Sequence, residues 1–396
     1  MNYSSAQIKS AQYRIFGLDV HQKTIVIAES TEKGEPRYVK TIENNEAAVR
    51  AFFQPVKDSV ELVFTTYEAG GCGNGLHRLL VKMGITNTIA APSKLPKSPG
   101  KKVKNDKVDA INLARLLRYM VLNGELKALH EVYVPEVDDE AIREKTRQRD
   151  TFKKQAKSTM NQITSMLRRH GKKYDLTKTK WTKTYRDWLT RVDFSHATIN
   201  TTFREYLDHL STLEALVAKC DREINKLVEE WNKAPLVKAF SCFRGFQQLA
   251  STCLVAEIGV FNRFETAPQI MSFLGMTCSE SSSGESVTLG RITKTGNTRA
   301  RTLLVEAACA ASRKPKPKSA FVRTCPPDLP QEVIDHAYKA QCRLYTKYWR
   351  LVNKGKSPNK AKIAVARELI GFIWWVAVMI ESKMSIQEEP KMTTAA

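Results

Sequence analysis

Short apolar segments that end in an acidic residue constrain the fold of this chain most. The segment 13–20, YRIFGLDV, reads as a β-strand that closes on Asp19, and Glu68 in TTYEAGG comes just after the apolar segment 60–66. A lone acid at a strand end is usually a cap, but acids at the ends of two strands of one sheet can converge. The first hundred residues therefore predict a sheet with carboxylates gathered at one edge.

Two further acids extend this group. Asp106 and Asp109 in KNDKVDA are one helical turn apart, so both lie on one face of a helix predicted over 106–121. Converging carboxylates repel one another unless positive charge lies between them. The four acids therefore predict a site for two Mg²⁺ or Mn²⁺ ions beside a phosphodiester, with Asp19 as the bridging ligand. His21 could support a ligand or contact the substrate, but a turn residue is the simpler interpretation.

The order of the predicted elements indicates an α/β domain. Strands are expected at 13–20, 24–28, 37–42, 60–66 and 86–91, and helices at 45–56, 74–83 and from 106. Three strands, then helix, strand, helix, strand and helix is the order of an RNase H-like (RuvC-like) domain. The pattern itself gives only α/β, and the positions of the acids make the prediction RNase H-like.

The formal net charge of +22 predicts a polyanionic partner, and nucleic acid is the first candidate. The positive charge comes in blocks beside the motifs, which disfavours a soluble enzyme that merely happens to be basic. One block is the Pro/Lys segment 92–105, whose Lys101, Lys102 and Lys104 are predicted nucleic-acid contacts.

Cysteine usage and hydropathy favour a cytosolic protein. The eight cysteines form no CxxC pair, and no Cys/His cluster has the spacing of a zinc site. The N-terminus has no signal-peptide pattern, so we expect reduced thiols in the cytosol. The apolar run 369–380 is too short to cross a bilayer and predicts a buried helix, so no membrane association is expected.

Heptad spacing dominates the middle of the chain. From Phe203 to Trp231 apolar residues alternate steps of three and four over four heptads, as in a coiled coil. A helix predicted over 139–170 could pack against this segment as an antiparallel hairpin, or the heptads could join two chains; both remain open. The segment 243–264 is also open between a helix–turn–helix-like DNA-binding piece and a helical hairpin of the core.

A serine run and a basic segment follow in the last third of the chain. Ser281, Ser282 and Ser283 precede Gly284. A Ser-rich turn is normally a flexible loop, and the alternative is a serine nucleophile on a Gly-hinged loop. Nearby basic residues would stabilise the charge that develops at phosphorus, and no His base is adjacent. The predicted nucleic-acid contacts here are Arg291, Lys294, Arg299 and Arg301.

A third basic block lies at 336–367. It holds nine Lys or Arg and no acid, interleaved with aromatic residues. This composition is typical of a surface that follows phosphates and stacks bases, although part of the aromatic set fits a core.

Five stretches of the sequence together resemble a known family. GLDVHQKT, YEAGG, PSKLPKSPGKKVKNDKVDA, FLGMTCSESSSGESVTLGRITKTGNTRAR and AVARELIGFIWW look like the motifs of the DEDD-type transposases of bacterial insertion-sequence family one-ten. The last two are most similar to its one-one-one-one group, and the related Piv invertases share the scheme. The resemblance covers about residues 13–380 in the order of the family.

The resemblance implies a division of the chain and a set of site residues. A RuvC-like domain is expected at 1–125, a helical coiled-coil region at 126–234, a mainly α-helical transposase domain at 235–385 and a disordered tail at 386–396. Asp19, Glu68, Asp106 and Asp109 stand at the DEDD metal ligands. Ser283 stands at the essential serine, with Ser282 as the nearest alternative.

The resemblance also implies a mechanism. A structured noncoding RNA would pair with donor and target DNA, and serine attack would give a covalent phosphoserine intermediate and strand exchange through a Holliday junction. Mg²⁺ (or Mn²⁺), a homodimer or tetramer and action at the nucleoid in the bacterial cytoplasm are implied as well. Two alternatives remain: a metal-dependent junction nuclease with a non-catalytic DNA-binding C-terminal domain, and a decayed relative that only binds nucleic acid.

Overall fold

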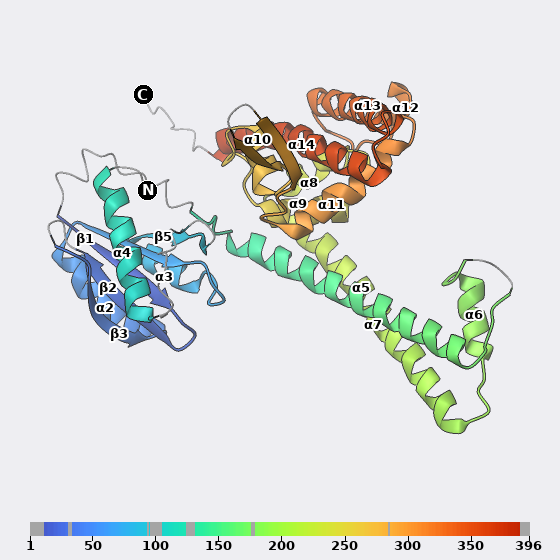
Figure 1. Ribbon diagram of the computed structural model, residues 1–396, viewed down its shortest axis with the longest axis horizontal. Helices are drawn as coiled ribbons and strands as arrows, with labels where there is room; N and C mark the ends of the chain where they lie inside the picture. The colour runs from blue at the N-terminus through green and yellow to red at the C-terminus, as the bar shows by residue number, and fades with distance from the viewer. Residues whose placement is uncertain are drawn as a thin grey trace, which may run out of the picture. The chain divides into compact units, whose positions relative to one another are not determined.

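The computed structural model describes residues 12–30, 34–92, 95, 105–123, 131–175, 179–283 and 286–388 (Figure 1). Within these ranges, the side chains of 282, 283, 286, 287, 289 and 385–388 are not described. The chain forms two compact units, Met1–Val134 and Pro135–Ala396.

A five-stranded mixed sheet organises the first unit. Its elements in chain order are β1 (Tyr13–Val20), β2 (Thr24–Ser30), β3 (Arg37–Glu43), α2 (Glu46–Ser59), β4 (Leu62–Glu68), α3 (Gly75–Lys82), β5 (Thr86–Ala90) and α4 (Asp106–Asn123). The strand order is β3-β2-β1-β4-β5. β2 is antiparallel to both of its neighbours, whereas β1, β4 and β5 run parallel. The predicted α/β domain is therefore confirmed in the order and type of its elements.

The alternation of side chains along β1 separates the two faces of this sheet. Phe16 and Leu18 pack with Phe53 of α2 and Leu80 of α3 on one face. Ile15, on the other face, packs with α4. Helices thus cover both faces, as expected for a sheet with parallel strands at its centre.

The backbones of α4 and β1 meet at Gly17. A Cβ atom on Gly17 would lie 2.2 Å from the carbonyl oxygen of Ala110 and 2.2 Å from the amide nitrogen of Ala114. Only glycine fits at this position, because the obstructing atoms belong to main chain. Ala110 and Ala114 are fully buried, so the small residues on both sides of the contact allow the close approach.

The first unit extends beyond the domain boundary predicted at residue 125. Glu131 forms a β-bridge with Ala90, and the Val132 amide donates a hydrogen bond to the Ile89 carbonyl at 2.8 Å. Val132 and Val134 pack against the core that faces α2 and α3. The segment 131–134 therefore belongs with the sheet.

A long antiparallel helical hairpin opens the second unit. It consists of α5 (Val137–Arg169) and α7 (Ala197–Glu230), with the short α6 (Lys183–Arg191) between them. The ion pairs Lys145–Glu223 and Arg149–Asp221 join the two long helices in antiparallel order. The heptad seam of α7 is thus covered by α5 of the same chain, and pairing of heptads between two chains stays a prediction.

Near the C-terminal end of α7, the buried apolar residue lies one position later than the heptad repeat predicts. Leu227 was expected in the seam, but its side chain is 37% exposed, and Val228 is buried instead. An α-helix has 3.6 residues per turn, so a strict 3.5-residue repeat drifts around it, and the facing position moves.

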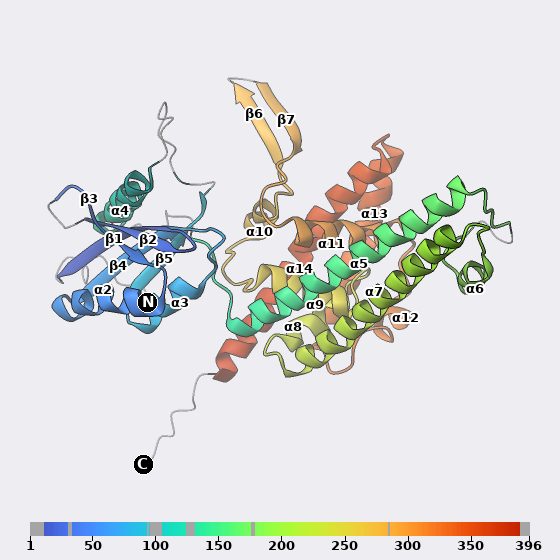
Figure 2. The same ribbon diagram turned by 90° about the horizontal axis from the view of Figure 1, so that it is seen from below.

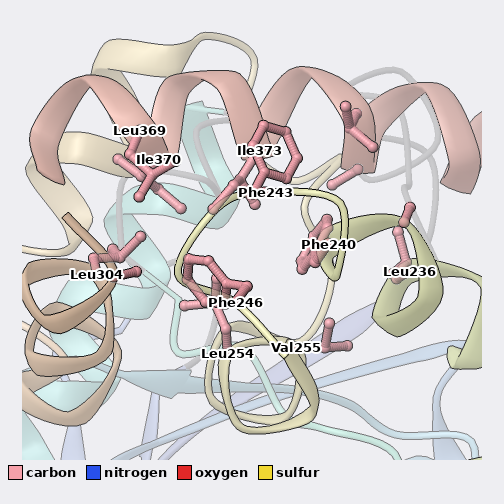
Figure 3. Packing of buried hydrophobic residues seen from close by; sticks show 14 of the residues in the cluster. Leu236, Phe240, Phe243, Phe246, Leu254, Val255, Leu304, Leu369, Ile370 and Ile373 are labelled. Atoms are coloured by element: carbon pink, nitrogen blue, oxygen red, sulfur yellow. The ribbon is translucent and has the colours of Figure 1, made fainter. Parts of the chain in front are cut away.

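The remaining helices form one apolar core with the base of the hairpin. They are α8 (Ala234–Phe240), α9 (Gln248–Ile258), α10 (Ala267–Phe273), α11 (Thr298–Ala308), α12 (Lys318–Val322), α13 (Gln331–Asn353) and α14 (Pro358–Glu388), with a 3₁₀ turn at Cys309–Ser312. Figure 3 shows Leu369, Ile370 and Ile373 of α14 beside Phe243 and Phe246 in this core. The division predicted at residue 235 stays a prediction, because Ile142 and Ile224 of the hairpin share the core.

The apolar run 369–380 is confirmed as part of a buried helix. Val365, Leu369, Ile373, Val376 and Ile380 are all buried against neighbouring helices. The apolar helix is longer than the run itself: Pro358–Met384 has the length and composition of a membrane span, and among the described residues it is alone in this. Such segments also occur as core helices of soluble proteins, and one face of α14 packs in the main core of the second unit. The helix continues to Glu388, three residues into the expected tail, and 389–396 lie outside the described residues.

Two features of this unit bear on function. Every residue of α9 from Ser251 to Ile258 is buried and only the first turn of the helix reaches the surface, so the core interpretation of 243–264 is favoured. The serine run lies in a two-stranded hairpin, β6 (Cys278–Ser283) and β7 (Ser286–Ile292), which projects from the helices (Figure 2). The sequence had favoured a loop here.

Substitution of Gly17 by alanine tests the close approach of α4 and β1. We expect Gly17→Ala to lower the free energy of unfolding of the first unit by about 1–3 kcal/mol or more, because the helix must move away from the strand. Urea unfolding measured by circular dichroism gives the value. Gly71→Ala is the control, since nothing lies within 4 Å of a Cβ there. Equal stability of the two variants would contradict the prediction.

Candidate active site

Asp19 and Glu68 lie at the ends of neighbouring parallel strands. Leu18 pairs with Tyr67, so the next residues, Asp19 and Glu68, continue the same register. Paired residues of parallel strands point to the same face, and Leu18 and Tyr67 face α2 and α3. Asp19 and Glu68 therefore belong to the opposite face, which α4 covers.

The first turn of α4 brings a third acid to Asp19. Because Ala110 packs on Gly17, Asp106, one turn earlier on the helix, lies near the end of β1. His21 joins the two acids: its Nε2 is 3.2 Å from Oδ2 of Asp19 and 3.4 Å from Oδ2 of Asp106. One ligand atom from each of the three residues lies within 4.8 Å of the others.

His21 is the member of this group that sequence reasoning undervalued. It is a turn residue, as expected, since its amide donates to the Thr24 carbonyl at 2.8 Å. Its ring nevertheless lies between two carboxylates. The only signal in the sequence was its position two residues after Asp19.

The electrostatic environment of Asp19 favours a bound cation. Burial raises the pKa of Asp19 above its ordinary value, and the carboxylates of Asp106 and Asp109 raise it further, while His21 opposes them. The fold therefore holds a carboxylate where negative charge is costly. A divalent cation would remove that cost, so these residues fit a metal site of oxygen and imidazole ligands.

The structure brings together only part of the predicted tetrad. Asp109 is close enough to influence Asp19 but is outside the three-residue group, and Glu68, exposed on the same face, is outside that group as well. The role of all four acids as metal ligands stays a prediction.

The serine run occupies the end of β6. Ser282 pairs with Val287 and Ser283 with Ser286, so Ser283 is the last strand residue before the turn. The side chains of Ser282 and Ser283 and all of Gly284 lie outside the described part. Ser281 and the described residues around it in β6 and β7 are exposed.

Glycines and one arginine fix the base of this hairpin. Gly275 and Gly296 have positive φ values of 62° and 71°, and a Cβ at Gly296 would lie 1.9 Å from the Phe273 carbonyl oxygen. Arg301 donates to the main-chain oxygens of Leu274 and Thr295, at 2.8 and 2.9 Å. The start of β6 and the segment after β7 are thus held together by main-chain contacts.

The predicted nucleic-acid contacts fall into three groups. Lys101, Lys102 and Lys104 lie outside the described residues. Arg291 and Lys294 are exposed at the end of the β6–β7 hairpin. The guanidinium groups of Arg299 and Arg301 bind protein groups instead, and whether any of these residues contacts nucleic acid stays a prediction.

Arg299 belongs to a buried ionic network centred on Glu257 of α9. The Glu257 side chain is fully buried and accepts two hydrogen bonds from Arg147 of α5, both at 3.0 Å. Arg299 of α11 donates to it at 3.0 Å and Asn297 at 2.6 Å. Arg299 also donates to Asp150 of α5 at 2.6 Å, so a single carboxylate ties three helices together.

The charge of Glu257 is stabilised despite its burial. Burial alone would raise its pKa, but hydrogen bonds from Arg147 and Asn297 and the charges of Arg147 and Arg299 outweigh burial, so the pKa of Glu257 lies below its ordinary value. These contacts give Glu257 a structural role in joining α5, α9 and α11.

Two family models match parts of the chain. Residues 16–171 match the DEDD transposase model of the IS110 group, described as a transposase. Residues 238–323 match the model described as "Transposase IS116/IS110/IS902 family". The first match contains the four acids and α5, and the second contains Glu257 and the β6–β7 hairpin.

Whole-chain relatives carry the same description. The chain is 36% identical to a putative transposase of Sinorhizobium fredii, over 93% of this chain and 90% of the relative. It is 29% identical to the transposase of insertion sequence element IS1533 of Leptospira borgpetersenii, over 86% and 97%. The transposase of IS1111A of Coxiella burnetii is 22% identical over 77% and 80%.

The fold and these relatives define a DNA-cleaving and recombining enzyme. The chain belongs to the IS110 family of insertion-sequence transposases. DNA is accordingly its substrate, and DEDD transposases are typically metal-dependent.

Removal of the Asp19 charge tests the metal site. We expect Asp19→Asn to abolish Mn²⁺ binding measured by isothermal titration calorimetry. Because the folded protein holds the pKa of Asp19 above its ordinary value, the ionised carboxylate destabilises the fold at neutral pH. The metal-free variant should therefore be at least as stable as the wild type. Asp58→Asn, at an exposed position, is the control; unchanged Mn²⁺ affinity in Asp19→Asn would contradict the site.

Glu257→Gln tests the ionic network. We expect it to cost about 2–3 kcal/mol of stability, less than the removal of a fully buried partner, because the Arg147 side chain is 45% exposed. A lowered pKa means that Glu257 stabilises the fold at neutral pH and that this contribution is lost in acid. The gap between variant and wild type should thus narrow below about pH 4. Urea unfolding across pH, with the exposed Glu306→Gln as control, measures both effects; a pH-independent gap would contradict the assignment.

Proposed function

We propose that this transposase is an RNA-guided recombinase that cuts DNA with a serine nucleophile, Ser283, assisted by a divalent-metal site at Asp19, Glu68, Asp106 and Asp109. One observation carries the proposal. The chain presents two separate sets of chemical groups, acids at a sheet edge in the first unit and a serine at the turn of an exposed hairpin in the second. A nuclease that used metal-bound water alone would need only the first set.

The topology of the first unit supports an RNase H-like (RuvC-like) assignment. Its strand order is β3-β2-β1-β4-β5, with only β2 antiparallel to its neighbours. Asp19 lies on the central strand, and the other acids come from the adjacent strand and from the helix on the same face. This is the arrangement that the order of predicted elements and acids implied.

The acids define what a metal would do here. Asp19 and Asp106, with Asp109 and Glu68 on the same face, would hold Mg²⁺ or Mn²⁺, which when bound supplies positive charge to a phosphodiester. His21 is placed to orient the carboxylates of Asp19 and Asp106 through its ring nitrogen.

In the proposed serine chemistry, each phosphodiester bond that is broken in the backbone is replaced by a serine–phosphate ester. Attack by the Ser283 oxygen on phosphorus forms a serine–phosphate ester, breaks one P–O bond of the backbone, and releases a deoxyribose hydroxyl that takes up a proton. Attack by a hydroxyl of another strand then restores a phosphodiester and frees the serine. Two such exchanges give a Holliday junction and its resolution without an external energy source.

The net charge and the covered heptad seam of α7 bear on the proposed partners and on the oligomeric state. A net charge of +22 supports simultaneous binding of DNA and a noncoding guide RNA. Since α5 occupies the apolar seam of α7, a dimer or tetramer would form through other surfaces. Action in the bacterial cytoplasm at the nucleoid follows from the substrate.

One observation favours the alternative, a metal-dependent junction nuclease with a non-catalytic C-terminal domain. Arg299 and Arg301, the nearest arginines after the hairpin, bind protein groups, so they are engaged elsewhere than at a phosphate. Arg291 and Lys294 would then have to stabilise the transferred phosphoryl group.

A denaturing gel distinguishes the serine recombinase from the metal-dependent nuclease. The protein is incubated with Mn²⁺ or Mg²⁺, RNA transcribed from the flank of the element, and end-labelled DNA carrying the element's junction. We expect a covalent protein–DNA adduct in the wild type and in Ser282→Ala but none in Ser283→Ala. Cleavage without an adduct in any of the proteins would establish the nuclease, and omission of the RNA tests guidance.

A further inference from the structure

The far end of the α5–α7 hairpin has a core of its own. Residues of the last turns of α5, of α6 and of the start of α7 pack together apart from the main core of the second unit, and Tyr185 and Phe203 are fully buried among them. Figure 1 shows α6 beside this end of the hairpin. We call this substructure, the described residues 163–175 and 179–213, the hairpin tip.

The hairpin tip carries a dense positive charge. From Arg168 to Arg191 the sequence has nine Lys or Arg and two acids. Seven of these basic residues are described and exposed: Arg168, Arg169, Lys172, Lys173, Lys180, Lys183 and Arg191.

Most of these basic side chains have no ionic partner among the described residues. In the described part of the chain, the side chains of Arg168, Arg169, Lys173, Lys180, Lys183 and Arg191 form no hydrogen bond or ion pair. This contrasts with Arg186, which forms a paired contact with Glu214 at 2.6 and 2.9 Å. The C-terminal dipole of α5 can explain Arg168 and Arg169 in its last turn, but not the lysines beyond it.

The backbone that presents two of these lysines is strained. Trp181 has a φ of 65°, a left-handed conformation that costs a non-glycine residue about 1–3 kcal/mol. It lies between Lys180 and Lys183, directly before the Thr182 cap of α6. The aromatic contacts of Trp181 and Tyr174 with Tyr185 hold this turn in place.

The packing of the aromatic rings decides which form of nucleic acid fits. Proteins that bind single strands present exposed aromatic faces on which bases stack. Here Tyr174, Trp181, Tyr185 and Trp188 pack on one another, with ring centroids 4.8–5.5 Å apart. The outer surface offers charges and few rings, which suits the phosphates of a duplex.

The length of α5 sets the distance between the hairpin tip and the ionic network around Glu257. Arg147 of α5 is bonded to Glu257 of α9, and Arg168 is 21 residues further along the same helix. At 1.5 Å per residue this is about 30 Å, close to one turn of B-DNA.

We infer that the hairpin tip is a binding site for the phosphate backbone of duplex DNA, about one helical turn away from the part of the second unit that carries the β6–β7 hairpin. The site lies outside the proposed serine and metal residues. DNA binding at the hairpin tip rests on other residues than the proposed chemistry and can be tested independently of it.

Matched lysine substitutions in the full-length protein test this site. The tip variant is Lys173→Gln/Lys180→Gln/Lys183→Gln, and the control is Lys153→Gln/Lys154→Gln/Lys157→Gln, which removes three exposed lysines from the middle of α5. Both variants lose the same charge, from lysines whose side chains form no hydrogen bond or ion pair within the described ranges, so both should fold. Equal far-ultraviolet circular dichroism and thermal midpoints check this.

Binding is measured by fluorescence anisotropy with labelled duplex DNA of about 40 base pairs, roughly four helical turns. We expect the tip variant to bind roughly tenfold more weakly than the control at physiological salt. The slope of log Kd against log salt concentration should fall by about 0.9 for each lost phosphate contact. A single strand of the same sequence and an RNA duplex are measured in parallel.

Two results would overturn the assignment. One is an equal loss in the tip and control variants, which would show only the general effect of net charge. The other is a loss confined to the single strand or to the RNA duplex, with duplex DNA bound as by the control. Ser283→Ala should bind like the wild type, so a failure of the serine chemistry leaves this test intact.

Discussion

The contact between α4 and Gly17 of β1 is the constraint on which the acidic site depends. A helix usually lies on a sheet at the distance set by interposed side chains, but here main chain meets main chain. The closeness of this contact places the first turn of α4 beside the end of the central strand. Asp106 therefore reaches the Asp19–His21 pair directly. A larger residue at position 17 would separate the acids without changing any of them.

The second unit depends on a different interaction, the buried ionic network around Glu257. It must join a long protruding hairpin to a core that is formed mostly by later helices. A buried carboxylate does this, because Glu257 satisfies arginines from α5 and α11 at once. Arg299 belongs to a basic block of the sequence and was therefore predicted to contact nucleic acid. In the structure its guanidinium group instead binds carboxylates of the protein itself. The charge of a cation engaged in this way is largely offset by the carboxylates beside it.

Sequence reasoning recovered the first unit well because each element there carries a local signal. Strand alternation, an Asn cap before α2 and the acids at strand ends all agree. It recovered less of the second unit. The β6–β7 hairpin was missed because its strand residues are mostly serine, threonine and glycine, whose preference for turns hides the pairing. The seam of α7 was read correctly until Leu227, where helical drift overrides a strict repeat. The place of His21 between two carboxylates depends on α4, which is distant in sequence, so no local pattern could reveal it.

The position of α14 at the end of the chain has a consequence for synthesis on the ribosome. Its apolar face lies in the main core of the second unit, so α8, α9 and α11 cannot complete the burial of their own apolar faces before α14 has been synthesised. The sheet of the first unit needs nothing beyond Val134. A growing chain therefore holds a folded acidic site long before the serine-bearing part is complete. A chain that stops before α14 would contain the whole first unit but would lack the helix that completes the core of the second.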